Sequence, residues 1–306
     1  MSETAMELID VKKNIGNKNI INGLSFSIHK GEVFGFIGPN GAGKTTTIRM
    51  MVGLMKITSG DVRILGQSVK SDFKDAISEV GAIVENPEMY PFMTGWQNLK
   101  HYARMMPGVT KERISEIVQL VGLEKPINDK VGKYSLGMRQ RLGIAQALLH
   151  KPSVLILDEP TNGLDPAGIR EIRQYIRKLA EQEHVAVIIS SHLLSEIEQM
   201  CDRIGLIKNG EMIATQDVGA ATKQTTSSEV IIEAEPANDA MEILKNEFNL
   251  SVSSSGNTLT IQTQRDAIPS IVQTFVQHDI QLFQISMTSS TLEDKFFELI
   301  GENTIE

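Results

Sequence analysis

Hydrophobic and polar residues follow one pattern up to about residue 215 and another pattern after it. In the first part, short continuous apolar runs are typical of strands buried on both faces; they lie at 33–37, 154–157 and 185–189. Between them, stretches such as 167–182 place apolar residues on one helical face and charges elsewhere. Strands that alternate with helices predict an α/β unit with a mostly parallel sheet.

The second part of the chain follows a polar stretch at 221–228, which indicates a linker. Beyond it, the pattern predicts in turn a strand, a helix, two strands, a helix and a strand, at 229–234, 238–248, 250–254, 258–263, 267–278 and 281–287. This β-α-β-β-α-β order is the ferredoxin-like arrangement, and we expect a last helix at 292–300 to pack against it. The expected domains are therefore 1–220 and a small α+β domain at 229–306.

Charge divides the chain at nearly the same place. The 306 residues carry a net charge of −8; residues 216–306 hold 14 acidic and 4 basic residues, whereas residues 1–215 are close to neutral at +2. A broadly basic surface is absent, so we expect no nucleic-acid partner. No apolar run approaches the ~18 residues of a membrane span, and the first residues do not resemble a signal peptide. The single cysteine, Cys201, excludes an intrachain disulfide and fits a reducing cytoplasm.

The strongest chemical signal is a glycine-rich loop between a predicted strand and a helical run at 46–54. It matches G-x-x-x-x-G-K-[ST] in full and consists of Gly38, Pro39, Asn40, Gly41, Ala42, Gly43, Lys44 and Thr45. Glycines let backbone N–H groups turn toward phosphate oxygens, and the helix N-terminus adds partial positive charge. We expect Lys44 to reach the β- and γ-phosphates of ATP, Thr45 to ligate Mg²⁺, and Thr46 to complete the nucleotide site.

A second element of such a site lies about 110 residues further on. The apolar run 155–157 ends in the carboxylates Asp158 and Glu159. Paired with the phosphate-binding loop, Asp158 is expected to hold Mg²⁺ directly or through water. Glu159 points differently and could polarise the attacking water as a general base.

Three further segments, in order along the chain, narrow the class. They are Tyr134-Ser135-Leu136-Gly137-Met138, Asn162-Gly163-Leu164-Asp165 and Ser190-Ser191-His192. Over residues 6–215 this order resembles the nucleotide-binding subunit of ATP-binding-cassette (ABC) transporters. The resemblance implies a P-loop ABC ATPase cassette, with a mostly parallel core sheet and a helical subdomain. It makes residues 134–138 the signature sequence, 162–165 the D-loop and His192 the switch histidine.

The resemblance also implies how these residues act. Ser135 and Gly137 open a helix and would bind a phosphate of the ATP on the opposite subunit, so two chains sandwich two ATP molecules head to tail. His192 would contact the γ-phosphate and work with Glu159 and Lys44 in catalysis. Asp165 would organise the subunit interface.

The chain departs from the family pattern at several positions. Leu136 and Met138 replace the usual Gly and Gln of the signature, and Ile15 stands where many relatives stack an aromatic ring on adenine. Glu85 replaces the Gln expected to contact Mg²⁺; it could ligate the metal, or it could be a solvated loop residue. The apolar segment 90–93 after it is either core or a patch that docks on a membrane subunit.

Glu85 together with the signature resembles the bacterial subfamily that exports bacitracin and lantibiotics. The resemblance implies an ATPase that powers export through a separate permease and lies in the cytoplasm, on the inner face of the cell membrane. Two alternatives stay open: a soluble ABC-type ATPase in translation or DNA repair, and a nucleotide-sensing module with little hydrolysis. Relatives of the first kind usually have tandem cassettes or a long insertion, and the presence of Glu159 and His192 argues against the second.

Overall fold

The computed structural model describes residues 3–192, 194–218 and 228–288. The chain forms two compact units, residues 1–217 and 218–306. The expected linker, apart from residue 228, and the expected helix at 292–300 lie outside the described residues. In the described part of the chain, no helix has the length and apolar character needed to cross a membrane.

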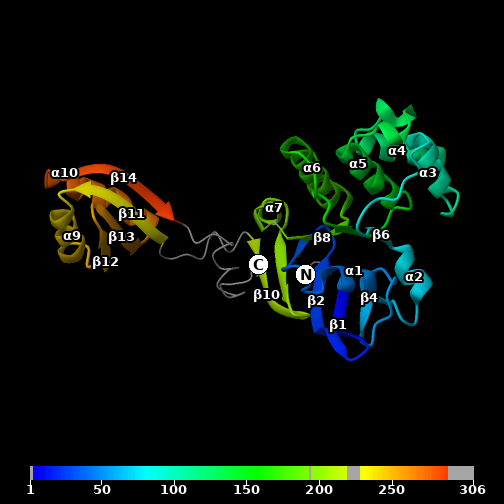
Figure 1. Ribbon diagram of the computed structural model, residues 1–306, viewed down its shortest axis with the longest axis horizontal. Helices are drawn as coiled ribbons and strands as arrows, with labels where there is room; N and C mark the ends of the chain where they lie inside the picture. Colours follow the sequence, from blue (N-terminus) through cyan, green and yellow to red (C-terminus); the bar gives the residue numbers. More distant parts are fainter. Residues whose placement is uncertain (1–2, 193, 219–227, 289–306) are drawn as a thin grey trace. The chain divides into compact units, whose positions relative to one another are not determined.

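A six-stranded sheet is the centre of the N-terminal unit (Figure 1). Its order is β10 (Glu211–Asp217), β9 (Arg203–Lys208), β3 (Val33–Ile37), β8 (Ala186–Ser191), β7 (Val154–Asp158) and β6 (Val80–Ile83). All neighbours pair in parallel except β10, which is antiparallel to β9, so the mostly parallel sheet is confirmed. Because β3, β7 and β8 are parallel and adjacent, the residues that follow them meet at one edge of the sheet.

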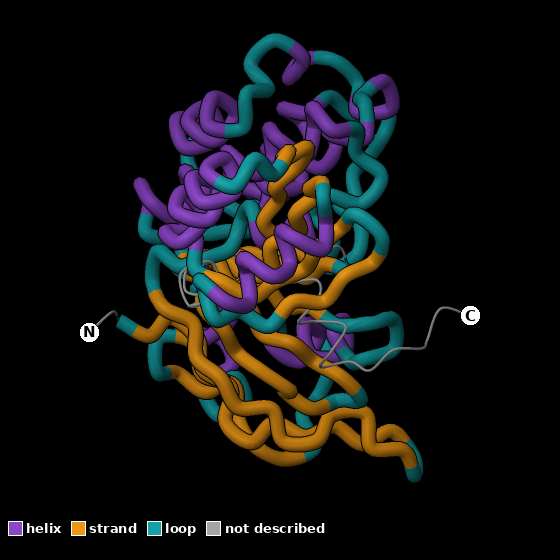
Figure 2. The backbone as a smooth tube through the Cα atoms, turned by 90° about the vertical axis from the view of Figure 1, so that its left-hand side faces the viewer, coloured by secondary structure: helices purple, strands orange, loops and turns teal. Residues whose placement is uncertain are grey.

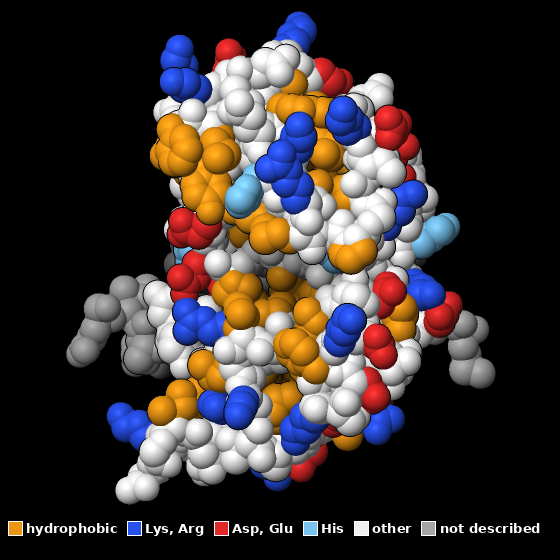
Figure 3. Space-filling view, turned by 90° about the vertical axis from the view of Figure 1, so that its right-hand side faces the viewer, with side chains coloured by type: hydrophobic (Ala, Val, Ile, Leu, Met, Phe, Trp, Pro, Cys, Tyr) orange, Lys and Arg blue, Asp and Glu red, His pale blue; other side chains and the backbone are white. Residues whose placement is uncertain are grey.

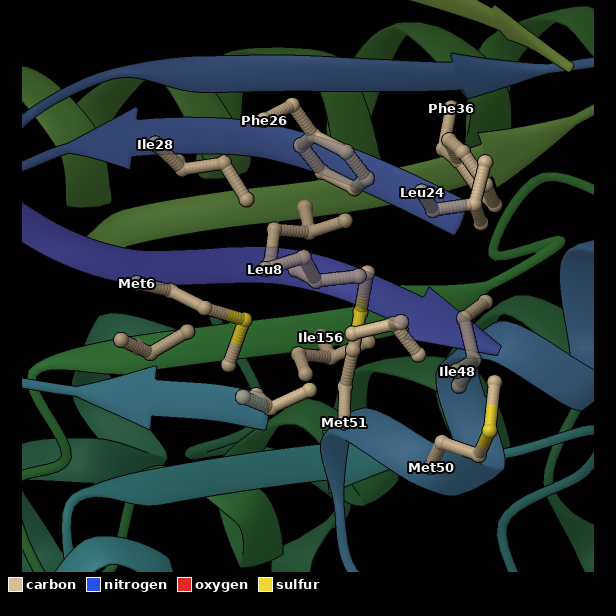
Figure 4. Packing of buried hydrophobic residues seen from close by; sticks show 14 of the residues in the cluster. Met6, Leu8, Leu24, Phe26, Ile28, Phe36, Ile48, Met50, Met51 and Ile156 are labelled. Atoms are coloured by element: carbon tan, nitrogen blue, oxygen red, sulfur yellow. The ribbon is translucent and has the colours of Figure 1, made fainter. Parts of the chain in front are cut away.

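A second, antiparallel sheet lies in the same unit, and the sequence pattern did not predict it. Its order is β2 (Lys18–His29), β1 (Thr4–Ile15), β4 (Ser59–Ile64) and β5 (Gln67–Ser68). The two sheets enclose a continuous apolar core, in which Phe26 of β2 stacks on Phe34 and Phe36 of β3 at centroid distances of 5.3 and 5.7 Å (Figure 4).

Helix α1 (Lys44–Met51) is buried in this core. Its side chains Ile48, Met50 and Met51 are fully buried and lie beside Leu8 and Ile156 in the same cluster (Figure 4). The helix that follows the glycine-rich loop is thus held firmly by the two sheets.

Between β6 and β7 the chain forms a helical subdomain, at the end of the unit away from the antiparallel sheet (Figures 1 and 2). It contains α3 (Gly95–Ala103), α4 (Lys111–Leu120) and α5 (Leu136–Ala147), with short 3₁₀ turns at Pro126–Asn128 and Val131–Lys133. Each of the three helices begins at a capping hydroxyl, from Thr94, Thr110 and Ser135 respectively. The remaining helices of the unit are α2 (Phe73–Ser78), α6 (Pro166–Glu183) and α7 (Leu194–Glu198).

In the residues that the structure describes, the C-terminal unit consists of strands and helices in the following order. It runs β11 (Ser228–Glu235), α9 (Ala237–Asn246), β12 (Val252–Ser255), β13 (Thr258–Thr263), a 3₁₀ turn (Arg265–Ala267), α10 (Ile268–Gln277) and β14 (Gln281–Thr288). The strands form an antiparallel sheet in the order β12-β13-β11-β14. Its core joins buried strand residues such as Ile232 and Ile261 to Leu244 of α9 and Phe275 of α10.

Candidate functional site

The loop between β3 and α1 is a tight turn. At two of its positions only glycine fits. Gly43 has φ +108°, and a Cβ there would lie 2.5 Å from Cδ1 of Ile21. A Cβ on Gly38 would lie 2.3 Å from the carbonyl oxygen of Ile207. The backbone is therefore packed closely against β2 and β9, which fixes the direction in which its N–H groups point.

Helix α1 begins at Lys44, two residues earlier than the sequence predicted, and ends at Met51 rather than at residue 54. Gly43 provides no side-chain cap, and the first turn holds no acidic residue. The first N–H groups of a helix have no partner within it, and the helix dipole makes this end partly positive. Thr45 and Thr46, both half-buried, lie in this first turn, at a helix end of the kind that attracts anions.

Lys44 folds back over the glycine-rich loop. Its Nζ donates to the carbonyl oxygens of Gly38 at 2.6 Å and Pro39 at 3.3 Å, and the residue is buried. Burial lowers the pKa of the ammonium group, while the nearby charges of Glu159 and Asp158 act in the opposite direction. The lysine and both predicted carboxylates therefore share one site.

The two carboxylates leave β7 in different directions. Asp158 is the last residue of the strand and is buried, whereas Glu159 has φ +50°, a backbone conformation that residues other than glycine adopt infrequently. The hydroxyl of Ser190, on the adjacent strand β8, donates to Oδ1 of Asp158 and accepts from the N–H of Glu159 at 3.1 Å. Asp158 thus lies at the end of the strand, whereas the chain changes direction at Glu159.

Glu159 makes a direct contact with the predicted switch histidine. Its Oε2 lies 2.8 Å from Nδ1 of His192, which immediately follows β8. Nearby, the hydroxyl of Thr161 is hydrogen-bonded to the carboxylate of Glu196 on α7. The segment after β7 is therefore tied at two points to the segment after β8.

Glu85 is paired with a cation from the same chain. It follows β6, has φ +68°, and forms an ion pair with Arg49 of α1. From the sequence, Glu85 could be a metal ligand or a solvated loop residue, and its pairing with Arg49 is not apparent there. The ion pair links the loop after β6 to the helix that follows the glycine-rich loop.

The signature residues lie together with the D-loop. Ser135 is the N-cap of α5, and its Oγ accepts from the N–H of Met138 at 3.2 Å. A Cβ on Gly137 would lie 3.7 Å from Leu164 of the D-loop. Asp165 caps α6, accepting from the N–H of Gly168 at 2.8 Å. The predicted helix start at Ser135 is thus found in the structure, and Asp165 has a helix-capping function.

Ile15 ends β1 and has 52% of its surface exposed. It pairs with Lys18 of β2, the strand that also carries Ile21 beneath Gly43. An apolar side chain is therefore open to contact on the hairpin whose second strand packs under the phosphate-binding loop.

A phosphate-binding loop, a buried lysine, two carboxylates and a histidine meet at one edge of the sheet. This arrangement is that of a nucleoside triphosphatase. The family model for ABC transporters matches residues 21–162. An uncharacterized ABC transporter ATP-binding protein of Bacillus subtilis (strain 168), YhcH, is 51% identical over 99% of this chain and 98% of its own. The chain belongs to the ABC transporter ATP-binding proteins, a family of ATPases.

Two other similarities are informative. The bacitracin transport ATP-binding protein BcrA of Bacillus licheniformis is 38% identical over 99% of both chains. Among solved structures, the dimeric structure of the bacterial ABC transporter cassette MJ0796 is similar with a TM-score of 0.62 and 25% identity, over 70% of this chain and 98% of that one.

Proposed function

We propose that this chain hydrolyses Mg·ATP to power export through a separate permease. The loop from Gly38 to Lys44 and the first turn of α1 bind the phosphates. The hydroxyl of Thr45 and the carboxylate of Asp158 are hard oxygen donors of the kind that Mg²⁺ prefers, and they would hold the metal. When bound, Mg²⁺ offsets the negative charge of the β- and γ-phosphates.

The observation that best supports hydrolysis is the contact of 2.8 Å between Glu159 and His192. Glu159 accepts the proton of the attacking water, and His192 holds this carboxylate in place and contacts the γ-phosphate. The positive φ of Glu159 directs its side chain away from Asp158, so that one carboxylate serves the metal and the other the water.

The complete site needs a second copy of the chain. Ser135 and Gly137 lie at the N-terminus of α5, and the partner copy would bring this end to the γ-phosphate. Asp165 and the D-loop lie beside them and would form part of the same interface. The similarity to a cassette solved as a dimer supports this assembly.

Exposed apolar side chains indicate where a permease could dock. Those on or near α2 and α3 are Leu54, Phe73, Tyr90, Phe92 and Met105, and apolar side chains gather on this side of the unit in Figure 3. The buried Asn98 binds both the N–H and the carbonyl oxygen of Tyr90, at 2.8 and 3.1 Å, so the loop presents a defined apolar surface. Docking there would place the chain on the inner face of the membrane.

The transported compound is proposed from the relatives. The proteins most informative on this point are named for bacitracin transport and, at 39% identity over 69% of this chain, for lantibiotic transport in Streptococcus pyogenes. We infer that the cargo is a peptide antibiotic or similar drug.

The test is the variant Glu159→Gln in the full chain. Loss of a general base lowers the turnover number by about 10²- to 10⁴-fold, while Lys44, Thr45 and Asp158 still bind ATP. The variant should also accumulate as an ATP-bound dimer, seen as a doubled mass by light scattering.

A matched control is Glu181→Gln, which removes a carboxylate that pairs with Arg177 on the surface of α6. It should leave turnover and mass unchanged. Turnover of Glu159→Gln close to that of the wild type would contradict the assignment of the base.

A further inference from the structure

The hydroxyl of Ser190 links the two carboxylate residues of the site. It donates to Oδ1 of Asp158 and accepts from the N–H of Glu159 at 3.1 Å, and the residue is completely buried. Ser190 lies directly opposite Asp158 in the pairing of β7 with β8, and opposite Phe36 in the pairing of β8 with β3. The hydroxyl is thus enclosed by the central strands of the sheet.

This contact does more than satisfy a buried backbone group. The N–H of Glu159 also donates to the carbonyl oxygen of Ser190, at 3.2 Å, so it has a partner without the hydroxyl. The proton of the Ser190 hydroxyl is donated to the carboxylate of Asp158. A hydrogen bond to a charged acceptor is stronger than one between neutral groups and orients the acceptor. With Oδ1 engaged, Oδ2 of Asp158 is the oxygen left to face the metal.

We propose that Ser190 is a positioning residue for Mg²⁺. It fixes the carboxylate of Asp158 so that one oxygen holds the metal or its water, and it keeps Glu159 at its turn beside that metal. This inference rests on the proposed function, since it assumes that Asp158 holds Mg²⁺. A chain with an apolar residue here would keep the fold and the phosphate-binding loop but hold its metal poorly.

The test compares Ser190→Ala and Ser190→Thr with the wild type, all as full chains. Loss of a hydrogen bond to a charged group corresponds to roughly a 10- to 100-fold change in an equilibrium constant. In Ser190→Ala we expect the Mg²⁺ concentration for half-maximal ATP turnover, and the dissociation constant of Mn²⁺ in the presence of ATP, to rise by about that factor. The affinity for ATP in a chelator should stay unchanged, because the loop and Lys44 are intact. Ser190→Thr, which keeps a hydroxyl, should recover most of the metal affinity.

Ser153→Ala is the matched control. The Ser153 hydroxyl donates to Oε2 of Glu79 at 2.7 Å, just before the opposite end of β7, so the same kind of bond is removed far from the site. It should leave metal dependence unchanged.

Each outcome has a defined meaning. Metal affinity in Ser190→Ala equal to that of the wild type would overturn the inference, as would an equal loss in Ser153→Ala or no recovery in a folded Ser190→Thr. If the wild type itself fails to bind ATP, it is the proposed function that fails. Mn²⁺ affinity is a binding constant and not a rate, so it tests the inference even in a chain that hydrolyses slowly.

Discussion

Glu85 forms an ion pair with Arg49 at the surface of the first unit. Its side chain is 60% exposed and that of Arg49 is 39% exposed. An ion pair this open to water contributes about 0–1 kcal/mol to folding, so it does little to stabilise the unit. Its position is more informative, because it joins the loop after β6 to the helix that begins at Lys44.

We predict that Glu85 and Arg49 affect coupling more than hydrolysis. In the isolated chain, Glu85→Gln should change ATP turnover only modestly, because Thr45 and Asp158 still hold the metal. In vesicles with the permease, transport per ATP hydrolysed should fall further, and Glu85→Ala should do worse on both measures. Arg49→Gln should reproduce the coupling loss of Glu85→Gln.

Arg63→Gln, which breaks a similar exposed ion pair with Asp61 on β4, is the control and should leave the ratio unaltered. A ratio that stays constant in all Glu85 variants would make Glu85 an ordinary loop residue.

Single residues of the site differ in how far the sequence reveals them. Lys44, Asp158 and His192 stand in motifs, so their spacing along the chain is enough to nominate them. Ser190 and Arg49 act on partners 32 and 36 residues away in sequence. No local pattern records such a pairing, since it depends on strand register and on where α1 packs. In the sequence, Ser190 was visible only as the first residue of the segment Ser190-Ser191-His192.

At the scale of elements, the N-termini of α1 and α5 provide backbone N–H groups that can bind phosphate. α1 begins without a side-chain cap and leaves its N–H groups for a ligand, whereas α5 begins at Ser135, whose hydroxyl already accepts from Met138. The remaining N–H groups of the first turn of α5, together with that hydroxyl, can still meet a phosphate. Two helix ends from different copies would then enclose one ATP.

We predict that mixing two inactive variants restores activity. Lys44→Ala removes phosphate binding in one copy, and Ser135→Arg blocks the end of α5 in the other. A heterodimer keeps one composite site in which both residues are intact, so turnover per heterodimer should recover toward half of that of a wild-type dimer. The measurement is ATP hydrolysis of each variant alone and of the mixture, with heterodimers verified through two different affinity tags. No recovery despite verified heterodimers would contradict the shared site.

Elements were predictable where their pattern is regular. The strand at 258–263 has the predicted bounds. β3 is apolar throughout, and β7 is apolar up to its last residue, Asp158, because both faces of these strands are buried. The β1–β2 pair was missed because its alternation breaks: the register shifts between Leu8 and Val11, and Asp10 has φ +45°. The early start of α1 was missed because its N-cap, Gly43, has no capping side chain that would mark it in the sequence.

At the scale of the whole molecule, the charge is carried by the second unit. Residues 216–306 have a net charge of −10, whereas the cassette residues are nearly neutral. Every phosphate motif ends by His192, before this acidic part of the chain begins. The second unit has an apolar core of its own. Nucleotide binding and the acidic unit are therefore separable on physical grounds.

We predict that deletion of residues from about 223 onward leaves a folded cassette that binds ATP with similar affinity. The apolar core that holds α1 lies wholly within the first unit, so circular dichroism should show a cooperative thermal transition. Dimerisation should respond more strongly, because two copies of the unit at 218–306, which holds 13 acidic and 4 basic residues and so a net charge of −9, repel each other unless their contact is apolar. If repulsion dominates, the ATP-bound dimer of truncated Glu159→Gln will be tighter than that of the full-length variant, and the difference will shrink as salt screens the charge. Loss of ATP binding in a truncated chain that still folds would instead show that the second unit helps to build the nucleotide site.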